Sequence, residues 1–285
     1  MVDRDLAHRF PPRDASIGDP VLVVENWSVH HPLHAGRQVV RNVDFHVRRG
    51  EVVGIAGLMG AGRTEFAMSL FGRAWGVNIS GQIRLDGREV VLSNVSEAID
   101  AGLAYVTEDR KQLGLILADD VRRNITLASL GRVAPNGVID EISELKAAGE
   151  YRTRMQIRCS DIYQEVGQLS GGNQQKVMLS KWLMTDPKVL ILDEPTRGID
   201  VGAKYEIYCI INELAAAGKG VVVISSEMPE LLGICDRICV MNDGAFVGEF
   251  AAADATQQKI MRAIMRNKDL RDGVAKHEPM GTMGS

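Results

Sequence analysis

Residues 169–175 read Leu-Ser-Gly-Gly-Asn-Gln-Gln, and the strand-like run at residues 189–196 reads Val-Leu-Ile-Leu-Asp-Glu-Pro-Thr. Ser170 is a favourable helix N-cap, so the pattern predicts a helix that begins here and runs to Met184. The two glycines after the cap leave the N–H groups of the helix start uncovered, as binding of an anion such as a γ-phosphate requires. Taken by itself, Ser-Gly-Gly can also be a simple cap and turn. The candidate residues are Ser170, Gly171, Gly172, Asn173 and Gln174.

A glycine-rich turn lies upstream, between the strand predicted at Val52–Ala56 and the helix predicted at Thr64–Phe71. Backbone N–H groups in such a turn point at an anion, and the dipole of the following helix favours negative charge. A phosphate loop has a lysine before its Ser or Thr, whereas this chain has Arg63 before Thr64. A glycine-rich turn without a ligand is the alternative. The candidate residues are Gly57, Leu58, Met59, Gly60, Ala61, Gly62, Arg63, Thr64 and Glu65.

Two carboxylates, Asp193 and Glu194, directly follow the strand predicted at Val189–Leu192. A buried strand that ends this way puts Asp193 at the carboxyl edge of the sheet, close to the glycine-rich turn. There Asp193 and the hydroxyl of Thr64 can hold Mg²⁺, and Glu194 can polarise an attacking water as a general base. The alternative is a buried strand capped by acidic residues at a helix start.

The composition is that of an ordinary globular protein. The 285 residues are 45% hydrophobic and 25% charged, with a net charge of -4, which fits one large domain or a core with a subdomain. The negative charge argues against a nucleic-acid binder that neutralises many phosphates. No apolar run is long enough to span a bilayer, and residues 1–19 lack the apolar segment of a secretory signal. Cys235 and Cys239 are interpreted as buried apolar residues rather than as metal ligands.

Predicted strands alternate with predicted helices along most of the chain, which indicates an α/β fold with a mostly parallel sheet covered on both faces. From Val121 to Glu165 the pattern is helical and polar, as in an inserted helical subdomain. Asp86 and Gly87 predict a hairpin turn between two short strands. The predicted strands besides those above are Val21–Glu25, Val43–Val47, Ile83–Leu85, Val90–Leu92, Leu103–Val106, Val221–Ile224 and Ile238–Met241, and the later helices are Ala203–Ala217 and Pro229–Cys235.

The order glycine-rich turn, Leu-Ser-Gly-Gly-Asn-Gln, Leu-Asp-Glu-Pro-Thr resembles the ATP-binding-cassette ATPases, over nearly all of residues 20–250. More narrowly, four segments look like the second cassette of bacterial simple-sugar importers of the ribose, galactose and xylose type. These segments are Gly57–Glu65, Thr107–Lys111, Asp193–Gly202 and Ser225–Glu230. The resemblance implies a P-loop NTPase core with an antiparallel β subdomain and an inserted helical subdomain, and it implies ATP and Mg²⁺ as cofactors.

The resemblance also divides the chain into a linker at residues 1–19, a nucleotide-binding domain at residues 20–250 and a C-terminal helix and tail at residues 251–285. The helical subdomain is expected at about residues 121–185. Met1–Arg4, followed by Phe10 and Pro11, is similar to the linker that leads into such a second cassette. The chain is then either the C-terminal half of a two-cassette protein or a stand-alone gene product.

In this family two cassettes face each other head to tail, and each ATP lies between the phosphate loop of one and the signature of the other. The resemblance therefore implies that Ser170–Gln174 serve the nucleotide of the partner cassette. Gly57–Thr64, Asp193 and Glu194 serve the nucleotide held by this chain. Asp200 matches the aspartate that communicates across the cassette dimer.

Three positions depart from the family pattern. Arg63 replaces a lysine, Glu108 stands where a glutamine senses the γ-phosphate, and Ser226 stands where a histidine orients the water. A guanidinium is broader than an ammonium, a glutamate adds negative charge beside a triphosphate, and a serine is shorter than an imidazole. The local site is thus predicted to bind nucleotide and to turn it over slowly. His31 falls where an aromatic residue stacks on the adenine, and it either stacks there or is merely exposed.

The sequence therefore predicts the ATPase domain of an importer, peripheral on the cytoplasmic face of the membrane, that couples ATP binding and hydrolysis to carbohydrate uptake. Its expected partners are an N-terminal cassette in the same polypeptide or a second chain, permease subunits that dock after Glu108 and on the helical subdomain, and indirectly a periplasmic sugar-binding protein. No nucleic acid is expected. The alternatives are a regulatory nucleotide-binding module without hydrolysis and a non-transport cassette that acts on ribosomes or DNA.

Overall fold

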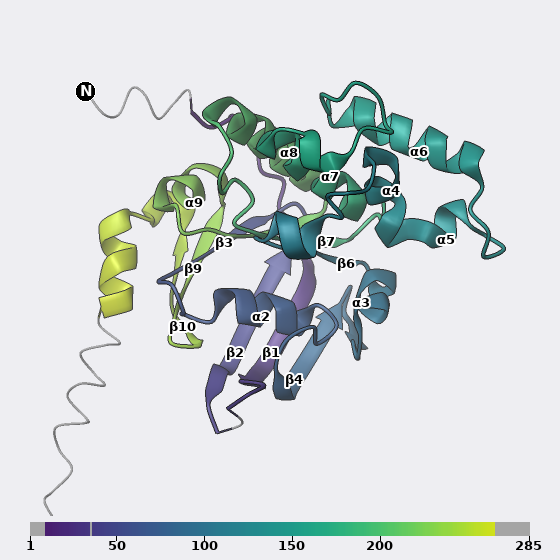
Figure 1. Ribbon diagram of the computed structural model, residues 1–285. Coiled ribbons are helices and arrows are strands. Elements are labelled where there is room, and N and C mark those ends of the chain that lie inside the picture. The colour runs from purple at the N-terminus through teal and green to yellow at the C-terminus, as the bar shows by residue number, and fades with distance from the viewer. Residues whose placement is uncertain (1–8, 35, 266–285) are drawn as a thin grey trace, which may run out of the picture.

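The computed structural model describes residues 9–34 and 36–265, and its central feature is a six-stranded sheet (Figure 1). Its strands lie in the order β10 (Ala245–Ala251), β9 (Arg237–Asn242), β3 (Val52–Gly57), β8 (Gly220–Ile224), β7 (Val189–Asp193) and β6 (Leu103–Val106). All neighbours are parallel except β10, which is antiparallel to β9. Every residue of β7 and β8 is buried, as expected for short apolar strands covered on both faces.

A second, antiparallel sheet packs near the first, with the strand order β2 (Gln38–Arg48), β1 (Pro20–His30), β4 (Val77–Leu85) and β5 (Arg88–Val90). Helix α2 (Arg63–Leu70) lies against this sheet (Figure 1). Its Phe66 is 1% exposed, and its ring lies 5.5 Å from that of Phe45 on β2 and 5.7 Å from that of Phe246 on β10. This aromatic cluster holds α2, the helix that follows the glycine-rich turn, in place between the two sheets. The short α3 (Val95–Ala101) precedes β6.

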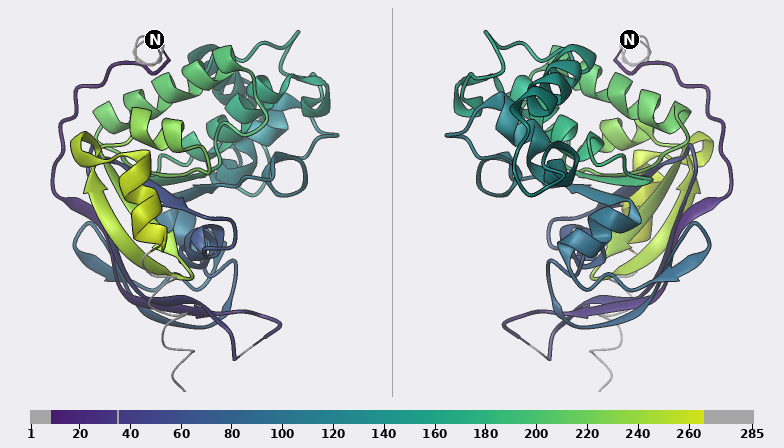
Figure 2. Two further views of the ribbon diagram at one scale, coloured as in Figure 1. Left: turned by 90° about the vertical axis from the view of Figure 1, so that its left-hand side faces the viewer. Right: turned by 90° about the vertical axis from the view of Figure 1, so that its right-hand side faces the viewer.

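Helices α7 (Gly171–Leu183), α8 (Val201–Ala216) and α9 (Met228–Ile234) form a layer on the other side of the six-stranded sheet (Figure 2). Val177, Ile207 and Leu231, one from each helix, are fully buried in a single core cluster with β7 and β8. The sheet thus has its apolar faces covered by different layers, and the carboxyl ends of its parallel strands are left to carry the polar site.

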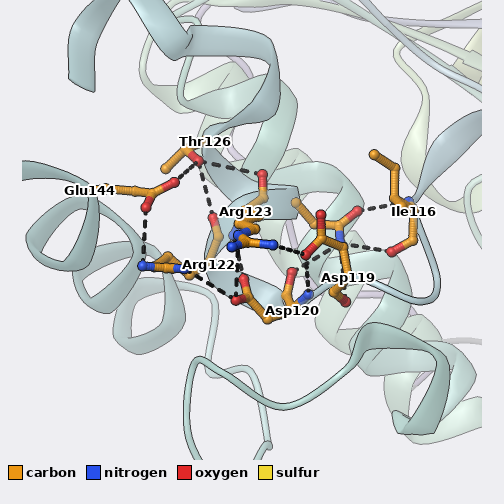
Figure 3. A network of polar contacts seen from close by, with 8 residues as sticks. Ile116, Asp119, Asp120, Arg122, Arg123, Thr126 and Glu144 are labelled. Carbon is orange, nitrogen blue, oxygen red and sulfur yellow. Dashed lines mark hydrogen bonds and ion pairs between the residues drawn. The ribbon is translucent and has the colours of Figure 1, made fainter. Parts of the chain in front are cut away.

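The helical subdomain consists of α4 (Val121–Thr126), η2 (Leu127–Ser129), α5 (Leu130–Val133) and α6 (Glu141–Arg154). A polar network joins its helices (Figure 3). Glu144 of α6 is 3% exposed, accepts a 2.9 Å hydrogen bond from Thr126 and pairs with Arg122 over 3.3 Å. Asn124 donates to the carbonyl oxygen of Ile116 and accepts from its N–H group. Because these buried groups satisfy one another, α4 holds both α6 and the incoming loop.

The N-terminal segment at residues 10–13, called the N-terminal strap below, lies across the helical layer. The ring of Phe10 lies 5.2 Å from that of Tyr208 on α8 and covers Gly233 on α9, where an added Cβ would be 2.4 Å from the ring. Arg13 pairs with Asp236 over 2.7 Å. The residues expected to form a linker therefore make specific contacts with the domain, as far as they are described. The remainder of that expected linker, residues 1–8, lies outside the described residues.

The expected α/β fold, with a mostly parallel sheet, an antiparallel sheet and a helical insertion, is confirmed. Two local predictions were wrong. The strand expected at Val90–Leu92 forms at Arg88–Val90, because Asp86 and Gly87 both have positive φ and make a two-residue turn that pairs Leu85 with Arg88. The helical pattern expected up to Glu165 ends at Arg154.

The helix ends there because Gln156 adopts a positive φ of 50° and turns the chain out of the helix. A short turn, η3 (Val166–Gln168), precedes α7, and the π-helical turn η1 (Arg110–Gly114) follows β6. Another turn, η4 (Ala252–Asp254), leads to a helix at residues 257–265. The rest of the expected C-terminal tail, residues 266–285, lies outside the described residues. Within the described ranges, no helix is both long and apolar enough to cross a membrane.

Candidate nucleotide-binding site

The glycine-rich turn joins β3 to α2 and walls a cavity of about 510 Å³. Gly60 and Gly62 have φ of 78° and 99°, a region that favours glycine. At Gly57 an added Cβ would lie 2.5 Å from a backbone carbonyl oxygen, so these glycines set the path of the loop. Leu58 and Met59 are exposed, and Ala61 is buried. The cavity is lined by Met59, Gly60, Ala61, Gly62, Arg63, Thr64, Glu65, Glu108, Glu194, Arg197 and Ser226.

The Arg63 side chain does not extend freely from this loop. One guanidinium nitrogen donates a 2.9 Å hydrogen bond to the carbonyl oxygen of Ser225, and another lies 3.9 Å from a carboxylate oxygen of Glu194. Only 11% of its side chain is exposed. Because a guanidinium has several donors in a fixed plane, Arg63 reaches both the end of β8 and the end of β7.

Glu194 is held on both sides. Its second carboxylate oxygen accepts a 3.1 Å hydrogen bond from the hydroxyl of Ser226. Its backbone has a φ of 48°, and its N–H group donates to the carbonyl oxygen of Ile224 over 2.8 Å. Glu194 and Ser226, which the sequence places 32 positions apart, therefore face the same cavity and touch. The serine hydroxyl reaches the glutamate directly.

Asp193 lies deeper, 1% exposed, at the end of β7. One carboxylate oxygen accepts a 2.9 Å hydrogen bond from the hydroxyl of Tyr105, while the other is buried with no hydrogen-bond partner among the described residues. Burial raises the pKa of this carboxyl to about 6, although the neighbouring hydroxyls of Thr64 and Tyr105 act in the opposite direction. A buried carboxylate oxygen with an open coordination position, next to a threonine hydroxyl, is a donor set that fits Mg²⁺.

Glu108 also faces the cavity, and its charge is compensated by an arginine that does not belong to the glycine-rich turn. Its carboxylate pairs with Arg197 over 2.7 Å, with 40% of the Glu108 side chain and 66% of the Arg197 side chain exposed. The carbonyl oxygen of Arg197 accepts a hydrogen bond from Arg110 on η1. The segment after β6 and the segment after β7 are therefore linked at the mouth of the cavity.

The Ser-Gly-Gly segment begins α7 as predicted. The hydroxyl of Ser170 caps the helix and accepts from the backbone and side-chain nitrogens of Asn173 at 3.4 and 2.9 Å. The Asn173 carbonyl in turn accepts from the backbone of Arg158. Gln174 is buried, and its amide donates to the carbonyl oxygens of Val166 and Leu169. Gln174 thus supports the turn before the helix from the inside.

Gly171 and Gly172 lie against the segment that follows Glu194. An added Cβ would be 3.2 Å from the carbonyl oxygen of Gly198 at the first position and 2.6 Å from Cβ of Ala203 at the second. Neither these glycines nor Ser170 line the cavity at the glycine-rich turn. Within the described chain, the two phosphate-binding candidates are therefore separate surfaces.

Two further candidates have local contacts. Asp200 is exposed and caps α8, where its carboxylate accepts from the N–H group of Ala203 over 2.9 Å. The His31 ring lies edge-on to Trp75 at 5.6 Å and 5.0 Å from the His34 ring, and its Nδ1 accepts from the backbone of Leu33. His31 is half-buried and does not line the cavity.

Sequence reasoning missed Tyr105, Arg197 and the carbonyl oxygen of Ser225 as parts of the site. Tyr105 had a usable signal: it lies one residue from the end of β6, and β6 pairs with β7 in a register that sets Val106 beside Leu192. The other two had none, because their roles come from contacts across neighbouring strand ends.

Comparisons with known proteins agree with this geometry. The family model for the ABC transporter domain matches residues 40–197. The chain is 54% identical over 273 residues to the L-arabinose transport ATP-binding protein AraG of Geobacillus stearothermophilus, covering 96% of this chain and 53% of that protein. It is 51% identical to the xylose import ATP-binding protein XylG of Geobacillus kaustophilus, covering 94% of this chain and 53% of that protein.

The ribose import ATP-binding protein RbsA of Bacillus subtilis is 45% identical, with 92% of this chain and 51% of that protein covered. The chain thus spans about half the length of the curated relatives it matches. A solved ATP-binding cassette of an ABC transporter superposes with a TM-score of 0.73 at 19% identity, covering 86% of this chain and 99% of the other. These matches confirm the resemblance drawn from the motifs, and the chain belongs to the ABC transporter family, with the fold of its ATP-binding cassettes.

Proposed function

We propose that this chain is an ATPase domain of a sugar importer, in which ATP binding and hydrolysis drive carbohydrate uptake through a membrane permease. The observation that carries the proposal is the convergence of the glycine-rich turn and Glu194 on one cavity, with Asp193 buried behind it at the end of β7. The printed names of the relatives, which concern arabinose, xylose and ribose, support a monosaccharide as the cargo.

The glycine-rich turn supplies the nucleotide contacts in this proposal. Gly60–Thr64 and the start of α2 line the cavity, so their N–H groups would bind the nucleotide phosphates, and Arg63 adds positive charge. Thr64 and Asp193 are the residues that would hold Mg²⁺, since the unpartnered Asp193 oxygen is the fitting donor. The ion supplies charge neutralisation for the phosphates when bound. Glu194 accepts a proton from the attacking water.

The local site is proposed to be slow. Both carboxylate oxygens of Glu194 already have partners, Arg63 on one side and Ser226 on the other. A general base works through a free lone pair within reach of its proton, so this arrangement lowers its availability. Glu108 keeps a negative charge at the cavity wall, although Arg197 compensates part of it.

The preserved Ser170–Gly172 surface is proposed to complete the site of a partner cassette, because it lies apart from the local cavity. The relatives are about twice as long as this chain, which supports a first cassette in the same polypeptide, with a separate chain as the other arrangement. The assembly is proposed to dock at the cytoplasmic face of the membrane, on permease subunits fed by a periplasmic sugar-binding protein.

The permease is proposed to bind beside η1 and the helical subdomain. Leu113 on η1, Leu127 on η2 and Leu130 on α5 are exposed apolar side chains, and so is Ile116 in the loop between η1 and α4. Exposed apolar side chains that together form one contiguous patch are typical of a protein contact.

ATP hydrolysis tests the proposal. The rate is measured for the chain alone and then for the chain assembled with its N-terminal cassette. We expect little activity alone and clear activity in the assembly, which Ser170→Arg abolishes by filling the surface offered to the partner's nucleotide. A matched control, Ser160→Arg, changes an exposed serine on the loop before α7. Unchanged activity of the assembly with Ser170→Arg would overturn the division of labour, and ATP binding without hydrolysis in any assembly would favour a regulatory module.

A further inference from the structure

A buried carboxylate with no assigned task lies directly behind the site. Glu230, in the first turn of α9, is 2% exposed. It accepts a 2.8 Å hydrogen bond from the hydroxyl of Thr196, and the hydroxyls of Ser225 and Tyr208 also hydrogen-bond to it. Three hydroxyls from three different elements thus meet on one carboxylate.

Among the described residues no ion pair to Glu230 is found, and the charged group that acts most strongly on it is another carboxylate, Glu227. Burial accordingly raises the pKa of this carboxyl above its usual value. A buried charge without a counter-ion is costly unless hydrogen bonds satisfy it, and a core position would be filled more favourably by an apolar side chain. The hydroxyl contacts therefore call for an explanation other than stability.

Two of the three hydroxyls belong to segments that carry the site. Ser225 precedes Ser226, and its carbonyl oxygen receives the hydrogen bond from Arg63. Thr196 follows Glu194 by two positions and is 1% exposed. The ends of β7 and β8 are also joined by the hydrogen bond from Glu194 to Ile224. Glu230 thus joins the segments that follow β7 and β8 on the side away from the cavity, while Glu194 and Ser226 of the same segments face the cavity.

We propose that Glu230 is a positioning residue that fixes the Glu194 segment and the Ser225–Ser226 segment relative to each other. The inference rests on the proposed function, in which this cavity binds a nucleotide. Glu194 and Ser226 line the cavity together with the start of α2, and in the proposed function the terminal phosphate of a triphosphate would lie beside them. Loss of the Glu230 contacts would therefore alter recognition of a nucleoside triphosphate and spare that of a diphosphate.

Tyr208 extends the same connection to the N-terminal strap, because its ring contacts Phe10 while its hydroxyl reaches Glu230. It therefore offers a milder variant. Tyr208→Phe removes one hydroxyl and keeps the ring that packs against Phe10, so the fold is retained even where a change at Glu230 itself prevents folding.

The test is the affinity of the full chain for ATP and for ADP, measured at equilibrium with fluorescent analogues, for Glu230→Gln and Tyr208→Phe. We expect the Kd for ATP to rise about tenfold in Glu230→Gln, a loss of one strong hydrogen-bonded contact, and by a smaller factor in Tyr208→Phe. The Kd for ADP should change less than about twofold in both. The matched control is Glu227→Gln, which removes an exposed carboxylate three positions earlier that pairs with Lys204.

Equal changes for ATP and ADP, or no change in either, would overturn the positioning role. A second measurement needs no nucleotide. In Glu230→Gln, hydrogen exchange should become faster in both residues 194–198 and residues 224–227. Faster exchange in only one of these segments, or in neither, would also overturn the positioning role. If the unaltered chain binds no ATP, the proposed function fails, and the exchange measurement still decides whether Glu230 joins the two segments.

Discussion

Arg63 donates a 2.9 Å hydrogen bond to the carbonyl oxygen of Ser225, so the residue that replaces the phosphate-loop lysine is tied to the segment that carries Ser226. The same guanidinium lies 3.9 Å from Glu194. Binding of a triphosphate has to compete with these contacts for the positive charge of Arg63. The arginine therefore links three parts of the site in a way that a single ammonium does not.

Arg63→Lys should raise hydrolysis at the local site. A lysine provides one compact charge, so it cannot engage both Ser225 and Glu194 in this geometry. Release of a contact worth about 1 kcal/mol corresponds to a rate increase of up to about fivefold. The measurement is phosphate release by the assembled two-cassette protein after the partner's own phosphate loop is inactivated. Arg84→Lys, which changes an arginine paired with Glu25 on the antiparallel sheet, is the control. A rate that stays constant or falls would contradict the prediction.

Asp193→Asn should stabilise the nucleotide-free chain above pH 6. Burial raises the pKa of Asp193 from 3.8 to about 6, so the unfolded chain loses this proton before the folded chain does. The free energy of unfolding therefore falls as pH rises from about 4 to about 6, and it stays lower by roughly 3 kcal/mol above that window. Asparagine has no such titration. Urea unfolding at pH 4, 5, 6 and 7.5 without Mg²⁺ should give a difference that grows across this window, and a difference independent of pH would refute the argument.

Gly233→Ala should destabilise the chain by about 1 to 3 kcal/mol, although alanine ordinarily favours a helix. The new Cβ would lie 2.4 Å from the ring of Phe10. Phe10→Ala should relieve this clash, so a double-mutant cycle measured by thermal unfolding should show a clear coupling between the two positions. Gly149→Ala on α6 is the control: its added Cβ meets nothing within 4 Å, and it should be neutral or stabilising. Additive effects at Phe10 and Gly233 would show that the strap does not pack as described.

Glu108→Gln should tighten ATP binding about two- to threefold at low salt, and Arg197→Gln should weaken it by a similar factor. The two side chains line the same cavity with opposite charges, and added salt should reduce both effects by screening. Their ion pair is largely exposed, so each change should cost less than about 1 kcal/mol in stability. Titrations of ATP at two salt concentrations measure this, and changes of the same sign in both variants would rule out a charge effect.

Several elements were predictable because short-range chemistry fixes them. Ser170 caps α7, and the apolar run at Val189–Leu192 lies within a fully buried strand. Other features depend on backbone conformations that side-chain patterns do not announce. The π-helical turn at Arg110–Gly114 and the positive φ of Gln156, which ends the helical pattern early, are of this kind.

The candidate site divides in the same way. The sequence predicts the glycine-rich turn, Glu194, Glu108 and Ser226 as site residues, and all of them line one cavity except Gly57 and Leu58 of the turn. It also predicts Asp193, which lies buried behind the cavity. The sequence also predicts Gln174 as a site residue, but its amide is buried and hydrogen-bonds to the turn before α7. The sequence does not decide whether His31 stacks on the adenine or is exposed, and in the structure its ring packs against Trp75.

The sequence by itself determined where each glycine-rich turn, helix cap and strand-end carboxylate occurs, because each depends on residues a few positions apart. Only the tertiary structure decided which of them meet. The order of β3, β8 and β7 in the sheet brings Arg63 to Ser225, 162 positions away, and it brings Ser226 to Glu194. Strand order is decided by the packing of whole faces rather than by any local pattern. This packing brings the glycine-rich turn, through Arg63, into contact with the segments that carry Glu194 and Ser225.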